Sequence, residues 1–183
     1  MKLVQPIRDK EKIAKIKDIL QGTSTRDWFM FVMGINTGLR ISDMLQLKVE
    51  DVKDKTHIII KDKKTGKEKR YKINDALREA IEYYVARKRL KVEGWLFPSR
   101  MEKDKPITRE QAYKILSGVS MMVGLEEIGT LTLRKTFGYH FYQETKDVTL
   151  LQEIFNHSEP SVTLRYIGII QDVLDPVVQK TRS

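Results

Sequence analysis

The amino-acid sequence predicts an α+β fold that is mainly α-helical, with a small antiparallel β-sheet or hairpin. Over most of the chain apolar residues recur at helical spacing, as at Ile13, Ile16 and Leu20. Between Val49 and Ile73 this pattern changes, and two strand-like segments flank a basic turn. No linker or internal repeat divides the 183 residues, so we expect one domain with its own core.

Three helices are expected in the first part of the chain. The segment Asp9–Gln21 has one apolar face and begins with a residue that can cap a helix. Thr25–Thr37 is nearly all apolar, which predicts a buried helix, and Gly38 after it suits a left-handed C-cap. A short helix should follow over Arg40–Leu47.

The middle of the chain predicts the sheet and another helix. His57–Ile60 is a β-branched run, Arg70–Ile73 alternates, and Lys61–Lys67 between them has the composition of a turn. We therefore expect a hairpin with a highly basic tip. Helical spacing returns over Asp75–Lys91, and Trp95–Pro98 should form a short extended segment.

The last third of the chain predicts helices again. A capping box at Thr108 opens a helix that should run to about Met122. Three closing helices are expected over Thr132–Glu144, Val148–Phe155 and Pro160–Ile167, the last with proline at its first position. A final amphipathic piece should cover about Asp172–Lys180.

Charge and composition narrow the classes of function. Lys and Arg number 34 against 25 Asp and Glu, a net charge of +9, which favours a polyanionic partner such as double-stranded DNA. A basic surface that serves only solubility explains the charge alone equally well. The absence of cysteine excludes disulfides, thiolate zinc sites and a cysteine nucleophile. The strongest apolar run, Trp28–Ile35, is too short to span a membrane, and no apolar leader is visible, so we expect a cytoplasmic, nucleoid-associated protein without a membrane partner.

Two segments with an arginine carry a family resemblance. Thr37–Leu45 contains a Thr-Gly-Leu turn followed by Arg40, with Asp43 three positions later. Leu133–Phe137 contains Arg134. These segments resemble the first and second signature boxes of the tyrosine site-specific recombinases, the phage integrases and their relatives. The acidic residue of the first box is usually Glu in that family, so Asp43, which would support the site from behind, is a mild departure.

The remaining matches follow in the family's order. Ile154–Ser158 resembles the family's Leu-Gly-His-Ser segment and carries His157. Tyr166 stands nine residues beyond His157, the separation that the family uses before its nucleophile. Lys64 lies at the expected hairpin tip, where the family places its catalytic lysine. Taken singly, each residue has an ordinary structural explanation, such as a solvated lysine or a core tyrosine, so the prediction depends on their combination.

The resemblance implies a catalytic domain that cuts and rejoins DNA without a metal or other cofactor. Tyr166 would attack a DNA phosphate and hold it as a 3′-phosphotyrosine, which conserves the bond energy. Arg40 and Arg134 would stabilise the negative charge on the non-bridging oxygens. Lys64 would give a proton to the departing 5′-oxygen, and His157 would donate a hydrogen bond to the phosphate. No small-molecule substrate is expected.

One position departs seriously from the family pattern. A histidine that helps to manage the tyrosine proton normally stands three residues before the second arginine, and here that position is Leu131. Because a general base contributes ~10²–10⁴ in rate, we expect slowed cleavage. His140, six residues beyond Arg134, should be structural. The alternative is a cleavage-deficient DNA-binding relative in which Leu131 marks lost chemistry.

The sequence offers less support for other classes of DNA-cutting enzyme. A nuclease or transposase that uses carboxylates and a metal finds no support, because no Asp, Glu or His cluster has ligand spacing. A type IB topoisomerase shares the chemistry, but the short chain and the residues of the two signature boxes favour a recombinase. We expect residues 1–183 to be the catalytic domain without an N-terminal core-binding domain, with modest DNA affinity. Tetramers should form on DNA, and the segment after Tyr166 would dock on a neighbouring subunit or pack on its own domain.

Overall fold

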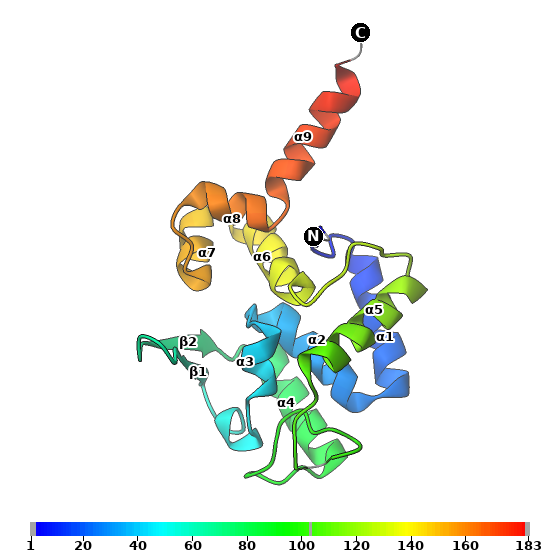
Figure 1. Cartoon of the computed structure of the whole chain (residues 1–183), viewed down its shortest axis with the longest axis vertical. Coiled ribbons are helices and arrows are strands. Elements are labelled where there is room, and N and C mark those ends of the chain that lie inside the picture. Colours follow the sequence, from blue (N-terminus) through cyan, green and yellow to red (C-terminus); the bar gives the residue numbers. More distant parts are fainter. Residues whose placement is uncertain (1–2, 103, 182–183) are drawn as a thin grey trace.

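The computed structural model describes residues 3–102 and 104–181 and shows helices around a central α2, with a hairpin on one side (Figure 1). The elements in chain order are α1 (Lys10–Thr23), α2 (Thr25–Thr37), α3 (Ile41–Leu45), the 3-10 helix η1 (Val49–Asp51), β1 (His57–Lys61), β2 (Glu68–Lys72), α4 (Asp75–Lys88), α5 (Arg109–Met122), α6 (Thr132–Thr145), α7 (Val148–Phe155), α8 (Pro160–Tyr166) and α9 (Ile169–Lys180). The predicted α+β class is confirmed, as is the order of its elements.

Several boundaries differ from those predicted. Helix α4 ends at Lys88, three residues early, because Arg89 adopts a left-handed conformation with φ 50°. Helix α3 is confined to Ile41–Leu45, and Arg40 is its N-cap. Helix α9 begins at Ile169 and not at Asp172, since the left-handed Gly168 lets the chain turn and start a helix at once. The η1 turn was not predicted.

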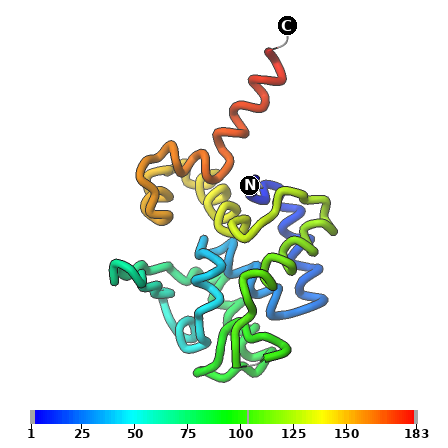
Figure 2. Tube along the Cα trace, in the orientation of Figure 1, coloured from blue at the N-terminus to red at the C-terminus, as the bar shows by residue number. Residues whose placement is uncertain are grey.

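Helices α6, α7 and α8 enclose a small apolar cluster of their own (Figure 2, yellow to orange). Its buried centre is Leu151, Phe155 and Ile167. Gly138 of α6 faces this centre, and a Cβ there would lie 2.7 Å from the Phe155 ring and 2.6 Å from Ile167. Glycine therefore allows α6 to approach α7 and α8 closely, and Tyr166 lies at the edge of the cluster.

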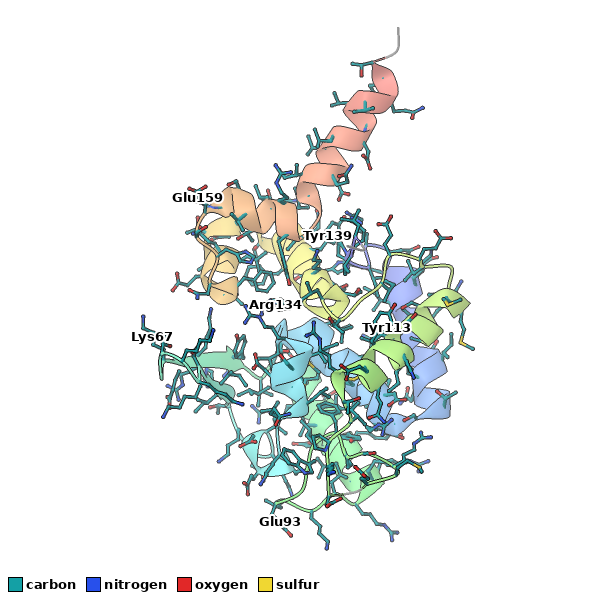
Figure 3. The ribbon with its side chains drawn as sticks, viewed as in Figure 1. Lys67, Glu93, Tyr113, Arg134, Tyr139 and Glu159 are labelled. Atoms are coloured by element: carbon teal, nitrogen blue, oxygen red, sulfur yellow. The ribbon has the colours of Figure 1, made fainter. Side chains whose placement is uncertain are left out.

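Strands β1 and β2 form the predicted antiparallel hairpin, with Ile58 opposite Tyr71 and Lys61 opposite Glu68. The tip is closed by the Asp62 side chain, which accepts hydrogen bonds from the backbone N–H groups of Lys64 and Thr65. The basic tip stands away from the helical body (Figure 3). Because successive strand residues face opposite sides, β2 turns its half-buried residues toward the body and its exposed residues to solvent.

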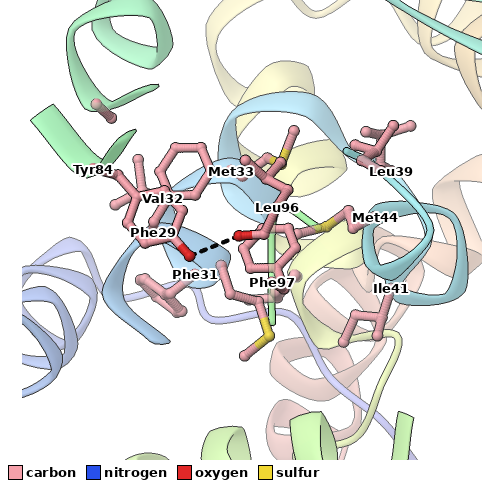
Figure 4. Packing of buried hydrophobic residues seen from close by; sticks show 14 of the residues in the cluster. Phe29, Phe31, Val32, Met33, Leu39, Ile41, Met44, Tyr84, Leu96 and Phe97 are labelled. Carbon is pink, nitrogen blue, oxygen red and sulfur yellow. Dashed lines mark hydrogen bonds between the residues drawn. The ribbon is translucent and has the colours of Figure 1, made fainter. Parts of the chain in front are cut away.

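The main core surrounds α2, which packs against α1, α4 and α6. The Phe29 ring stacks on Tyr84 with centroids 4.6 Å apart and lies 5.7 Å from the Phe97 ring. The buried Tyr84 hydroxyl donates to the Leu96 carbonyl at 2.6 Å (Figure 4), so its polar end is satisfied. This core confirms the buried helix predicted from the apolar run and fixes the end of α2, where the first signature segment begins.

In the part of the chain that the structure describes, none of the helices combines the length and the apolar character that crossing a membrane requires.

Candidate active site

A tight turn at the end of α2 brings the two signature segments together. Gly38 has φ 71° and ends α2 as a left-handed C-cap, as predicted. The Thr37 hydroxyl accepts from the Leu39 N–H at 3.2 Å and so fixes the next residue. The Gly38 carbonyl then accepts a 2.7 Å hydrogen bond from Nη1 of Arg134. Arg40 follows at the N-cap of α3, with its side chain exposed.

Arg134 lies at the junction of α6, α7 and the turn after α2 (Figure 3). It is 5% exposed, its Nη2 donates to the Phe155 carbonyl at 3.3 Å, and its guanidinium carbon lies 4.3 Å from the Phe155 ring centroid. Within residues 3–102 and 104–181 no carboxylate forms an ion pair with Arg134 or Arg40. In the described part of the chain neither guanidinium has a carboxylate partner, which suits an anionic ligand.

His157 and Tyr166 face each other beside this arginine. Their ring centroids are 5.0 Å apart, and Nδ1 of His157 lies 2.9 Å from the Thr163 hydroxyl oxygen. Burial lowers the pKa of His157, and the charges of Arg134 and Arg40 lower it further. The imidazole is therefore neutral at pH 7, with one nitrogen held by Thr163 and the other free to meet a ligand.

Tyr166 ends α8 with its side chain half-buried. Its ring lies edge-on to Phe155 with centroids 5.4 Å apart. Burial raises the pKa of the Tyr166 hydroxyl, while the neighbouring charges of Arg134 and Arg40 act in the opposite direction. The hydroxyl therefore keeps its proton at neutral pH, and an attack by its oxygen requires that the proton be removed.

The structure does not bring the side chain of Lys64 to these residues. Lys64 is exposed at the hairpin tip, and its backbone N–H is bound to Asp62. Another lysine of the same hairpin lies at the site: Nζ of Lys69 donates to the Glu153 carbonyl at 2.8 Å. Our reading of the sequence missed Lys69, because it began the second strand at residue 70. If the second strand is taken to begin two residues earlier, at Glu68, its alternation places Lys69 on the same face as Tyr71, toward the helical body.

Asp43 occupies the first turn of α3 with a half-buried side chain. Tyr71 of β2 lies close enough to feel the charge of Asp43. Burial raises the pKa of Tyr71, and the negative charge of Asp43 raises it further, while the positive charges of Arg134 and Arg40 lower it. The hairpin therefore contributes Tyr71 as well as Lys69 to the surroundings of the arginines.

Leu131 is the N-cap of α6 and is 37% exposed, so a larger polar residue would fit there. One helical turn later Nζ of Lys135 lies 4.9 Å from the ring centroid of Tyr166 and donates to the Val4 carbonyl at 2.9 Å. His140 lies outside this group, and its Nε2 is 2.9 Å from the Ile7 carbonyl oxygen, in keeping with the structural role expected for it. Among the described residues no group of three or more His, Cys, Asp or Glu side chains could hold a metal ion.

Comparison with known proteins places the fold and the sequence in one family. The model of the phage integrase family matches residues 8–170. The "Probable integrase/recombinase YoeC" of Bacillus subtilis is 51% identical over 172 residues, which are 94% of this chain and 93% of that protein. The tyrosine recombinase XerA of Pyrococcus furiosus is 25% identical over 172 residues, which are 93% of this chain but only 59% of that protein.

A solved structure shows the same fold. The XerH site-specific recombinase bound to palindromic difH substrate superimposes with a TM-score of 0.74 at 23% identity, over 98% of this chain and 53% of that one. The chain thus spans about half the length of XerH but nearly all of YoeC. From the family match and the shared fold together, the chain belongs to the phage integrase family and is a tyrosine recombinase catalytic domain.

Proposed function

We propose that this domain cuts and rejoins double-stranded DNA through a 3′-phosphotyrosine on Tyr166, without a metal ion. The observation that carries the proposal is the grouping of Arg40, Arg134 and His157 around Tyr166. Among the residues that the structure describes, no carboxylate is paired with either arginine. A phosphate bound there would offset the two arginine charges and accept their hydrogen bonds. Trapping of a Tyr166–DNA adduct is the experiment that tests it.

The reaction follows from the charges and the hydroxyl. The Tyr166 oxygen attacks phosphorus and loses its proton, the bond from phosphorus to the 5′-oxygen breaks, and that oxygen takes up a proton. Arg40 and Arg134 hold the non-bridging oxygens while negative charge gathers on them. A 5′-hydroxyl then attacks the phosphotyrosine, reforms the phosphodiester and releases Tyr166, so no external energy source is needed.

Two further residues complete the proposed mechanism. Neutral His157 donates a hydrogen bond to the phosphate from the nitrogen that Thr163 does not hold. Lys64 supplies the proton to the 5′-oxygen, which requires that the hairpin tip move onto bound DNA, because the side chain is exposed and apart from the arginines in this structure. Asp43 supports Arg40 from the first turn of α3.

The residue at 131 separates the proposal from its alternative. Leucine can neither accept a proton nor form a hydrogen bond, so Leu131 leaves the Tyr166 proton without the histidine that the family resemblance predicts at this position. We propose that this slows cleavage without abolishing it, since Arg40 and Arg134 would still stabilise the negative charge on the phosphate. The alternative is a DNA-binding protein that does not cleave, which predicts binding with no covalent product.

Self-association on DNA is part of the proposal. Helix α9 packs on α8 and projects from the body (Figure 1), with Val173, Leu174, Val177 and Val178 exposed. An exposed apolar helix face of this kind favours contact with another protein surface. We propose that α9 docks on a neighbouring copy within a tetramer on DNA, at the nucleoid, and that residues 1–183 act as a catalytic domain of modest DNA affinity.

A further inference from the structure

Lys69 differs in burial from the residues next to it along the chain. Residues 61–68 and 70 are all exposed, whereas Lys69 is half-buried. Its ammonium group points toward α7, where it donates to the Glu153 carbonyl at 2.8 Å across 84 positions of sequence. A lysine side chain is costly to immobilise, so this one is held in place by its surroundings.

Two of the charges near Lys69 are the positive charges of the signature arginines, and one, that of Glu153, is negative. Burial lowers the pKa of Lys69, the charge of Arg134 and, to a smaller extent, that of Arg40 lower it further, and the carboxylate of Glu153 opposes them. Lys69 is in turn one of the charges that lower the pKa of His157. The ammonium group therefore shares one electrostatic neighbourhood with both signature arginines and the histidine. The positive charges of Lys69, Arg40 and Arg134 repel one another and are offset only in part by Glu153, so a further anion among them relieves the remaining repulsion.

We propose that Lys69 binds the scissile phosphate together with Arg40 and Arg134, exchanging the Glu153 carbonyl for a non-bridging oxygen. The inference rests on the proposed function, because it deepens the same site. Lys69 keeps its proton throughout and forms only a charge-assisted hydrogen bond, so its role is distinct from the proton donation assigned to Lys64. It makes Lys69 a further catalytic residue.

The competing explanation is structural: Lys69 ties the hairpin to α7 and never meets DNA. Lys69→Gln separates the two, because the amide can still donate to the Glu153 carbonyl but carries no charge. Lys72→Gln is the matched control. Lys72 lies on the same strand with the same charge, but it is exposed on the opposite face.

The test is a binding measurement in the Tyr166→Phe background, where no cleavage can occur. Each variant is titrated with DNA that carries either an ordinary phosphate or an uncharged methylphosphonate at the cleavage position. The methylphosphonate should weaken binding when Lys69 is present. In Lys69→Gln that penalty should shrink on the order of 10-fold, the worth of a charge-assisted hydrogen bond. In Lys72→Gln it should be unchanged.

An equal penalty in the Lys69 and Lys72 variants, or no penalty in any variant, would overturn the proposal. Cleavage gives a second, independent result. In a second DNA substrate a sulfur replaces the bridging 5′-oxygen, so that the leaving group needs no proton. This substrate should restore the cleavage rate of Lys64→Ala but not that of Lys69→Gln. Restoration of Lys69→Gln would mean that Lys69 is the proton donor and that the role proposed here is wrong. Failure of the proposed function shows separately, as absence of adduct with the unmodified chain.

Discussion

Nη1 of Arg134 and the carbonyl oxygen of Gly38 are 2.7 Å apart, although the residues are 96 positions apart in sequence. This hydrogen bond ties the two signature segments to each other. The carbonyl is available because Gly38 ends α2 in a left-handed conformation, and Phe137, three residues after Arg134, packs against the same glycine. The geometry of the arginine pair thus depends on a residue without a side chain.

Gly38→Ala should therefore destabilise the fold and slow cleavage together. Alanine at position 38 would be strained in the left-handed conformation, and its Cβ would collide with the Phe137 ring. We expect the free energy of unfolding to fall by roughly 1–3 kcal/mol. Gly66→Ala is the matched control, since φ there is 72° but no atom lies within 4 Å of the added Cβ. Urea denaturation of both variants measures the difference. Equal losses would show that crowding by Phe137 contributes nothing.

His157 should make stability depend on pH. Its pKa lies below 6.5 in the folded chain, because burial and the nearby arginines disfavour the charged imidazole. Between that lowered value and 6.5 the unfolded chain binds more protons, so stability rises with pH and is complete above 6.5. The free energy of unfolding of the unmodified chain minus that of His157→Gln should therefore increase with pH across this window. A difference that is flat, or that falls with pH, would contradict the assignment.

Leu131→His should speed formation of the covalent product. A histidine at the N-cap of α6 restores a group that can take the Tyr166 proton, a step worth up to ~10²–10⁴ in rate. Because Leu131 is 37% exposed, the free energy of unfolding should change little. Leu131→Asn is the control, since it is polar but cannot act as a base at neutral pH. Equal rates for the two variants would show that proton transfer at this position is not limiting.

Much of the fold could be predicted from sequence because its signals are local. The apolar run Thr25–Thr37, the glycine after it and the capping box at Thr108 each gave an element that the structure confirms. The fold and family that the resemblance implied are confirmed as well, while the residue roles in the site stay predictions.

What could not be predicted depends on contacts between distant segments. The direction of Lys69 follows from the hairpin register and from a carbonyl of α7, neither of which leaves a pattern in neighbouring residues. The burial of Arg134 requires the Phe155 ring and the Gly38 carbonyl to meet in space. The early start of α9 depends on the conformation of Gly168, whose neighbours gave no signal of a helix beginning there.

Binding to DNA should weaken steeply with salt. A domain of net charge +9 that neutralises several phosphates releases their counterions, and the logarithm of affinity should fall with the logarithm of salt with a slope of about 0.9 per phosphate. Fluorescence anisotropy at a series of salt concentrations measures the slope. A value below one would argue against a phosphate-dominated interface.

The most direct test of the central claim is a suicide-substrate assay with nicked DNA. Unmodified chain and Tyr166→Phe are incubated with the substrate in the presence of a chelator, and the products are resolved on a denaturing gel. We predict a protein–DNA adduct that forms with the unmodified chain and is absent in Tyr166→Phe, while both bind DNA. An adduct that persists in Tyr166→Phe would contradict the assignment of the nucleophile. Binding without any adduct, also in Leu131→His, would identify a DNA-binding relative that does not cleave.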